Sequence, residues 1–253
     1  MFTKVALTII VILILAGLGC SSPASSIVFT SDRDGNLEIY SVNSNGEKLT
    51  NLTNTQTNEF APVLSPNHRL ISFLSGVQGN TSVEVMRIDG TERIPLTEGG
   101  SEHSSQQWSP SNDRIAYVKK DGSDSNIYMT SVGETKTALL TSIEGHQVGD
   151  WSGDGNSVAF AVLGGSGQGI YVRNPDGVNE FQVTEAPDYS PLWSPDSRKL
   201  AFLSTRDGNP EIYMMDADGG NLKRLTESES AEYDLSWSPN GQSLLFVSER
   251  DGN

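Results

Sequence analysis

The sequence predicts an all-β protein made of repeated four-stranded sheets. Three sets of residues recur at one common period: a Trp-Ser-Pro motif, an aromatic residue in a short apolar segment, and a Leu-Thr pair. Gly, Pro, Asn and Asp punctuate the chain so densely that no amphipathic helix of ten or more residues fits between them. A period between 20 and 50 residues is the signature of a repeat architecture.

The Trp-Ser-Pro motif contains every tryptophan of the chain and indicates where the first strand of each sheet ends. A degenerate copy begins at Leu64, and from there the intervals are 44, 43, 42 and 44 residues. The four structural anchors are Trp108, Trp151, Trp193 and Trp237.

The second, third and fourth strands follow from the other two sets. The recurring aromatics, expected in the second strands, are Phe29, Phe73, Tyr117, Phe160, Phe202 and Phe246. Segments such as 211–215 predict the third strands, and the Leu-Thr pairs, such as Leu225-Thr226, close the fourth. Asn-Gly and Asp-Gly between the third and fourth strands favour tight hairpins.

Residues 204–226, followed by the Trp-Ser-Pro-Asn-Gly that begins at Trp237, resemble the WD40-like (PD40) repeat of TolB-type propellers, and the resemblance extends over residues 27–253. It implies a β-propeller of four-stranded blades, with the first strands lining a central channel, and an unidentified protein partner; the Tol complex would be that partner only if the role of TolB itself carried over. TolB has an α/β domain before its propeller, whereas here the first repeat starts soon after Cys20. The chain is therefore predicted to be TolB-like and not TolB itself.

The repeat count favours six blades, with the last one incomplete in this chain. Five first strands and six second strands can be identified. A complete ring of six would need a further third, fourth and first strand, about 35 residues. A ring of five would join the strand at Trp237 to the blade of residues 27–53, but it would leave residues 243–248 without a place.

The N-terminus predicts an export signal over residues 1–19 and a linker over residues 20–26. The apolar run of residues 5–18 follows Lys4 and is shorter than the ~20 residues that span a bilayer. Residues 16–20 resemble a bacterial lipobox, and Cys20 is the only cysteine. We expect a lipid on Cys20 and an anchored protein in the periplasm or at the cell surface; secretion without a lipid is the alternative.

The formal charge of −15 excludes nucleic acid as a partner, because both surfaces would repel each other. An acidic exterior favours cations or a basic protein partner. We expect a monomer.

One repeat position carries a titratable side chain in all five copies that precede the Trp-Ser-Pro motif. These residues, here called the head residues, are Glu59, His103, His146, Asp188 and Glu232. In a propeller they would form a ring at one mouth of the channel, where their oxygen and nitrogen atoms could bind a divalent cation or a basic segment of a partner. A solvated loop without a ligand is the alternative interpretation.

No catalytic motif is complete, so the sequence predicts a binding or scaffolding module and not an enzyme. The segment from Gly164 to Gln168 lacks the last glycine of a Gly-x-Ser-x-Gly elbow. Two enzymatic alternatives remain open: the gating half of an exported serine peptidase of the prolyl-oligopeptidase kind, and a metal-dependent polysaccharide lyase that uses His103 and His146.

Overall fold

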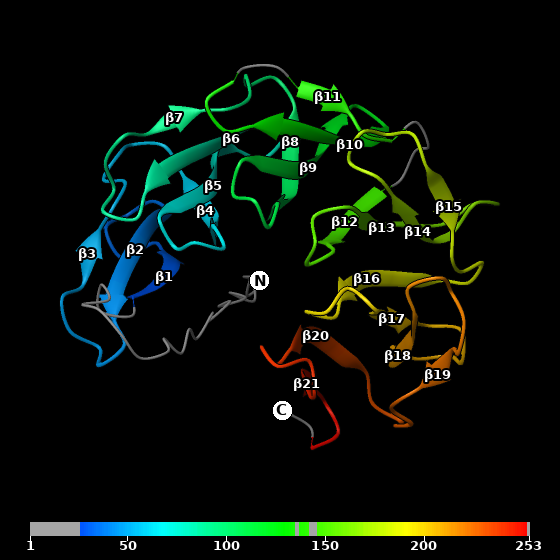
Figure 1. The fold of residues 1–253 in the computed structure, drawn as a ribbon. Coiled ribbons are helices and arrows are strands. Elements are labelled where there is room, and N and C mark those ends of the chain that lie inside the picture. Colours follow the sequence, from blue (N-terminus) through cyan, green and yellow to red (C-terminus); the bar gives the residue numbers. More distant parts are fainter. Residues whose placement is uncertain (1–25, 135–136, 142–145, 252–253) are drawn as a thin grey trace, which may run out of the picture. The chain divides into compact units, whose positions relative to one another are not determined.

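The computed structural model describes residues 26–134, 137–141 and 146–251. These residues contain strands and turns and no helix, and every sheet is an antiparallel meander with its strands in chain order (Figure 1). The all-β prediction is therefore confirmed. The chain divides into two compact units, residues 1–102 and 103–253, and each is described by itself.

The first unit contains a three-stranded sheet and a four-stranded sheet. The strands of the smaller sheet are β1 (Ser26–Ser31), β2 (Glu38–Asn43) and β3 (Thr50–Asn51). Those of the larger sheet are β4 (Glu59–Leu64), β5 (Leu70–Val77), β6 (Asn80–Arg87) and β7 (Ile94–Pro95). β1 pairs with β2.

The second unit contains three four-stranded sheets and one pair of strands. The first sheet consists of β8 (Glu102–Trp108), β9 (Arg114–Asp121), β10 (Asp124–Ser131) and β11 (Thr137–Leu139). The second consists of β12 (His146–Trp151), β13 (Val158–Val162), β14 (Gly169–Arg173) and β15 (Glu180–Gln182). The third consists of β16 (Asp188–Trp193), β17 (Lys199–Ser204), β18 (Glu211–Asp216) and β19 (Lys223–Arg224). The pair is β20 (Glu232–Trp237) and β21 (Leu244–Ser248). Each tryptophan ends a first strand, as predicted, and β20 pairs with β21, which places residues 244–248 within a sheet.

The serine of the Trp-Ser-Pro motif builds the turn between the first and second strands. In the third sheet of this unit, Ser194 Oγ donates to Asp196 Oδ1 at 2.6 Å and accepts the Lys199 N–H at 2.9 Å. Ser152 makes the same pair of bonds with Asp154 and Ser157, at 2.6 and 2.9 Å. A hydroxyl that both donates and accepts in this way fixes a tight turn without help from the rest of the fold.

The threonine of the Leu-Thr pair ties the end of each sheet to its third strand. Thr226 Oγ1 accepts the Ile212 N–H at 2.9 Å, and Thr184 Oγ1 accepts the Ile170 N–H at the same distance. The bond recurs in all five sheets that contain a third strand, with the other copies at Thr53, Thr97 and Thr141. The threonine thus continues the ladder where the short fourth strand stops.

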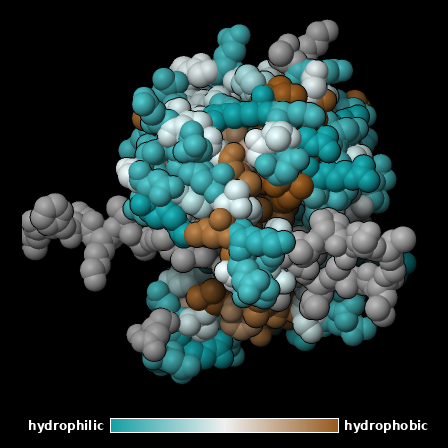
Figure 2. All heavy atoms as spheres, turned by 90° about the vertical axis from the view of Figure 1, so that its left-hand side faces the viewer, coloured by the Kyte–Doolittle hydropathy of each residue, from teal (hydrophilic) through white to brown (hydrophobic). Residues whose placement is uncertain are grey.

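Apolar faces of consecutive sheets form the core. Ile170 and Val172 of β14 pack with Leu200 and Phe202 of β17 in one buried cluster. Burying a side chain of this size stabilises the fold by about 1.5–3 kcal/mol. Hydrophilic side chains cover most of the face shown in Figure 2, in agreement with the acidic composition.

Candidate functional site

The head residues begin the first strands, and the side chains that can be described are buried. Glu59, His146, Asp188 and Glu232 are the first residues of their strands, and His103 is the second residue of β8. Glu59 and Glu232 have no exposed surface, Asp188 is 1% exposed and His103 3%. These four side chains are therefore part of the packed interior of their sheets and not of a solvated loop.

Each of the three head carboxylates forms an ion pair with an arginine of its own sheet. Arg93 Nη2 lies 3.1 Å from Glu59 Oε1, and Arg206 Nη2 lies 2.5 Å from Asp188 Oδ2. The third pair joins Arg250 Nη2 to Glu232 Oε1 at 3.0 Å. A buried carboxylate requires such a partner, since an uncompensated charge in the interior is strongly destabilising.

The arginines reach the same place from different parts of the repeat. Arg206 lies in the turn between β17 and β18, donates to Ser204 Oγ at 3.0 Å and covers the ring of Phe202 at 5.9 Å. Arg93 lies just before β7, yet it donates to Ser75 Oγ at 3.1 Å and covers Phe73 at 5.2 Å. A guanidinium is thus held by three equivalent contacts: the head carboxylate, the serine near the end of the second strand, and the aromatic ring.

Burial raises the pKa of Glu59, and the hydroxyl of Thr55 and the guanidinium of Arg93 oppose this effect. Thr55 Oγ1 lies 2.9 Å from both carboxylate oxygens. The side chain is therefore engaged both by its own sheet and by the connection before it, which suits a structural role better than acid-base chemistry.

The two sheets with a histidine at the head position differ from this arrangement. The ring of His103 lies 5.4 Å from that of Tyr117, and Lys119 stands where the other sheets have the serine. His146 begins β12, where its backbone is paired with Val162; the serine position is then occupied by Val162 itself. At the position of Arg206, these two repeats carry Asp121 and Gly164 in place of an arginine.

The sequence predicts that the head residues lie together as a ring of ligands at one mouth of a channel. Within the described part of the chain, no group of three or more His, Cys, Asp or Glu side chains is arranged to share a metal ion. Glu59 belongs to the first unit, and the four other head residues belong to the second. What the structure places around each head carboxylate is an arginine and not a second head residue.

A β-bulge follows the head residue in the first strand. Ala61, Ser105, Ser190 and Asp234, each two residues after a head residue, have φ values of 49–52°, in the left-handed region. The pairing with the second strand shifts at the same place in β4, β16 and β20. Such a conformation is costly for a residue other than glycine, so the packed sheet must impose it.

Asp150 joins two sheets and was not identified from the sequence. Its Oδ1 accepts the N–H of Trp151 at 2.9 Å, and its Oδ2 accepts the N–H of Trp193, in the next sheet, at 3.0 Å. Burial raises the pKa of this carboxyl to about 7, although both hydrogen bonds act to lower it. The sequence does contain one signal: an acidic residue precedes Trp151, whereas Gln107, Leu192 and Ser236 precede the other three tryptophans.

Glycine permits the close approach of those two sheets. A Cβ atom on Gly149 would lie 2.3 Å from Pro191 Cγ and 2.5 Å from the Pro191 carbonyl oxygen. Gly153, which replaces the proline of the motif, would place a Cβ 2.6 Å from the Pro195 oxygen. The variant Trp-Ser-Gly sequence is therefore explained by packing.

The predicted leader and Cys20 lie outside the described residues. In the part of the chain that the structure describes, no helix is long and apolar enough to cross a membrane.

This chain is similar to known TolB proteins in both sequence and structure. The chain is 29% identical over 201 residues to the "Protein TolB homolog" of Chlorobium luteolum, which covers 79% of the chain and 36% of that relative. The chain thus spans about a third of the relative's length. Among solved structures, TolB from Acinetobacter baumannii superposes with a TM-score of 0.68 at 17% identity, over 87% of this chain and 57% of that one.

A puromycin hydrolase crystal structure also superposes, with a TM-score of 0.71 at 16% identity, over 88% of this chain and 40% of that one. Structural likeness at such low identity establishes the fold alone. The family model described as "TolB beta propeller domain" matches residues 82–253, more than half of the chain. The repeats, the four-stranded sheets and this match together show that the chain belongs to the TolB β-propeller domain family.

Proposed function

We propose that this protein is an exported, lipid-anchored propeller that binds a protein partner in the periplasm or at the cell surface. The observation that carries the proposal is the membership of the TolB β-propeller family, together with the similarity to a TolB homolog over most of the chain. The head carboxylates support a binding role over an enzymatic one, because the fold itself uses Glu59, Asp188 and Glu232 in buried ion pairs.

In the second unit, the end of the sheets at which the first strands begin is the proposed contact surface. Leu163 is 53% exposed there, in the turn between β13 and β14; in the first unit, considered by itself, Val77 ends β5 and is 58% exposed. Both follow residues that pair near a head residue, since Ser75 is opposite Glu59 and Val162 is opposite His146. Exposed apolar side chains at loop tips on a rigid scaffold suit recognition of a protein.

Photo-crosslinking in cells that express the protein tests the contact surface. A photoreactive amino acid at Leu163 should capture a partner. The matched control is Val178, which is 73% exposed but lies in a turn at the opposite end of the same sheet. Equal capture from both positions, or none from Leu163, would contradict the proposed surface.

The anchor requires its own experiment. Metabolic labelling with a radioactive fatty acid should mark the protein, and Cys20→Ser should abolish both the label and recovery in the membrane fraction. An unlabelled protein that is released in soluble form would support plain secretion instead.

The structural likeness to puromycin hydrolase favours one alternative, the gating domain of a serine peptidase. Reaction of the native protein with a fluorophosphonate probe distinguishes the two functions, because a binding module has no activated serine to be labelled.

A further inference from the structure

A hollow with a volume of about 290 Å³ lies between two complete sheets of the second unit. It is bordered by the sheet of β12–β15 and the sheet of β16–β19, which lie side by side (Figure 1). The turns that follow Trp151 and Trp193 contribute to it, so it lies at the end of the sheets opposite the head residues. Pockets for small molecules have volumes of roughly 300–1,000 Å³, so this hollow suits a compact ligand.

The walls of the hollow combine apolar surface with negative charge. The buried part of the apolar surface comes from Val172 and Trp193. Phe181 of β15 adds an aromatic ring that is 46% exposed. The carboxylates come from two exposed turn residues, Asp154 between β12 and β13 and Asp218 between β18 and β19. The described residues that line the hollow include no lysine, arginine or histidine.

The negative charge of this hollow is not neutralised by its own sheets. Arg173 Nη1 lies 2.7 Å from Glu180 Oε2, and Lys199 Nζ lies 3.0 Å from Asp216 Oδ1, so both cations pair with acidic residues outside the lining. Hydrogen bonds from the side chain of Ser152 and from a backbone N–H lower the pKa of Asp154 and keep its carboxylate ionised at neutral pH.

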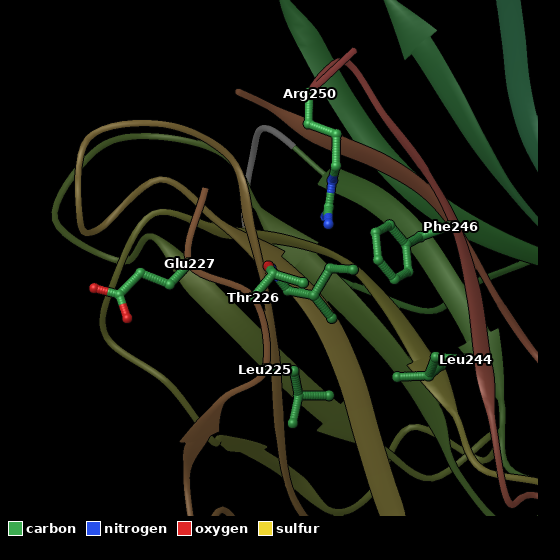
Figure 3. A pocket seen from close by; sticks show the side chains of 7 residues that line it. Leu225, Thr226, Glu227, Leu244, Phe246 and Arg250 are labelled. Carbon is green, nitrogen blue, oxygen red and sulfur yellow. The ribbon is translucent and has the colours of Figure 1, made fainter. Parts of the chain in front are cut away.

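The hollow beside β21 has different walls. It is lined by Leu225, Leu244 and Phe246, and Arg250 lies over the Phe246 ring at 5.8 Å. Figure 3 shows the Glu227 carboxylate pointing away from these side chains. That hollow therefore already contains a cation, whereas the described lining between the two complete sheets is acidic and neutral.

The turn that contains Asp154 does not require a negative charge. Ser152 Oγ donates to Asp154 Oδ1 at 2.6 Å and so holds the turn closed. In two other repeats an asparagine accepts the equivalent bond, Asn67 at 2.8 Å and Asn240 at 2.7 Å. Aspartate and asparagine build such turns equally well, so the charge at this position is free to serve another purpose.

Asp218 and Phe181 are likewise not required by the repeat. Asp218 Oδ1 accepts an N–H two residues later at 2.9 Å, a bond that Asn45 makes in the turn before β3 at 3.2 Å. The position of Phe181 is held by Ala138 and Lys223 in the other two complete sheets of the second unit. Two carboxylates and an exposed ring thus meet at one hollow, although these turns and strands form without them elsewhere.

We propose that this hollow binds a small aliphatic diamine, whose two ammonium groups pair with Asp154 and Asp218. Its methylene chain packs against the ring of Phe181 and the apolar wall. A ligand with two positive charges neutralises both carboxylates, and its apolar chain suits the surface that lies with them.

A divalent metal ion fits these walls less well than a diamine. Ca²⁺ takes about six to eight oxygen ligands, and within the described residues no group of three or more His, Cys, Asp or Glu side chains is arranged to hold a metal. The apolar surface would also remain unused. The site lies at the opposite end of the sheets from the proposed contact surface and does not depend on the proposed function.

Isothermal titration calorimetry of the full chain in about 0.1 M salt tests the site. The probes have the same length and differ in charge: 1,4-diaminobutane has two ammonium groups, 1-aminobutane has one and 1,4-butanediol has none. We expect saturable binding of the diamine, binding of the monoamine that is weaker by about tenfold or more, and no binding of the diol. Equal affinity for the diamine and the monoamine would overturn the proposal.

Substitutions in the walls test which side chains bind the diamine. Asp154→Asn and Asp218→Asn should each weaken binding by about tenfold or more, and Phe181→Ala by about threefold to tenfold. The matched control is Asp196→Asn, because Asp196 accepts the same turn bond from Ser194 Oγ, at 2.6 Å, and does not line the hollow. It should bind like the unmodified chain. A loss as large as that of Asp154→Asn would mean diffuse attraction to an acidic surface and would overturn the proposal.

Two-dimensional NMR locates the diamine and checks the fold. The indole N–H signal of Trp193 should move when the diamine is added, whereas that of Trp108, in another sheet, should stay in place. Each asparagine variant should keep the spectrum of a folded protein, because Asn67 and Asn240 build this turn in other repeats. Movement of Trp108 without Trp193 would place the ligand elsewhere and overturn the proposal. Capture of a partner at Leu163 is unaffected by either result, so the two hypotheses are judged separately.

Discussion

Replacing Asp150 with asparagine tests whether the bridge between two sheets makes stability depend on pH. The pKa of this carboxyl is about 7 in the folded protein, against an ordinary value of 3.8. Between these values the folded protein keeps a proton that the unfolded chain has released, so this group lowers the free energy of unfolding as the pH rises from about 4 to about 7. At about 1.4 kcal/mol for each pKa unit, the full effect is about 4 kcal/mol. The residue retains some exposure, so we expect about 2–4 kcal/mol.

The asparagine side chain is neutral at every pH and keeps one oxygen to accept one of the two N–H groups. The Asp150→Asn variant should therefore gain about 2–4 kcal/mol relative to the unmodified protein between pH 4.5 and pH 8. Urea unfolding curves measured across this range give the difference at each pH. Asp154→Asn is the control, because the Ser152 hydroxyl and the Asn156 N–H lower the pKa of Asp154 and confine its effect to pH values below about 4. A constant difference between Asp150→Asn and the unmodified protein would refute the reasoning.

Three further substitutions test contacts that hold the sheets together. Gly149→Ala should lower the free energy of unfolding by roughly 1–3 kcal/mol, since the new methyl group collides with Pro191; an unchanged urea midpoint would show that the sheets can separate there at no cost. Arg206→Met should cost about 3–5 kcal/mol by leaving Asp188 buried without a cation, and adding Asp188→Asn should recover a large part of this loss in a double-mutant cycle; additive losses would mean that the pair is not coupled. Thr226→Val should cost about 1–3 kcal/mol by leaving a third-strand N–H without its acceptor, and calorimetry that finds no change in the melting temperature would rule out that role.

The sequence predicted the fold because its information is local and repeated. A first strand ends at each tryptophan because the following serine closes the turn within five residues, as Ser194 does with Lys199. The Leu-Thr pair could be recognised as a boundary for a similar reason, since Thr226 bonds a strand only fourteen residues earlier. The fourth strand proved shorter than the pattern suggests, and β19 contains only Lys223–Arg224.

The surroundings of the head residues were harder to predict, because they depend on contacts between distant residues. Nothing local to Glu59 indicates that its partner is Arg93, 34 residues later and outside the usual turn. The pairing of Asp188 with Arg206 had a usable signal, since an arginine stands four residues after the aromatic in this repeat, whereas Asp121 and Gly164 stand there in the repeats with histidine. Periodicity alone also could not reveal Asp150, whose role arises from the approach of two sheets.

An arginine reaches the head carboxylate by two routes, and the route determines which turn of the sheet must keep its conformation. Where Arg206 supplies the cation, the turn after β17 must keep its length and course. Where Arg93, just before β7, supplies the cation, the ion pair does not depend on the turn between β5 and β6. That turn contains only two residues, Gln78 and Gly79. Insertions and changes of composition at that turn should therefore be tolerated without loss of the buried pair. A turn that the buried ion pair does not need can therefore change, and the binding specificity of the protein can change with it, while the sheets stay the same.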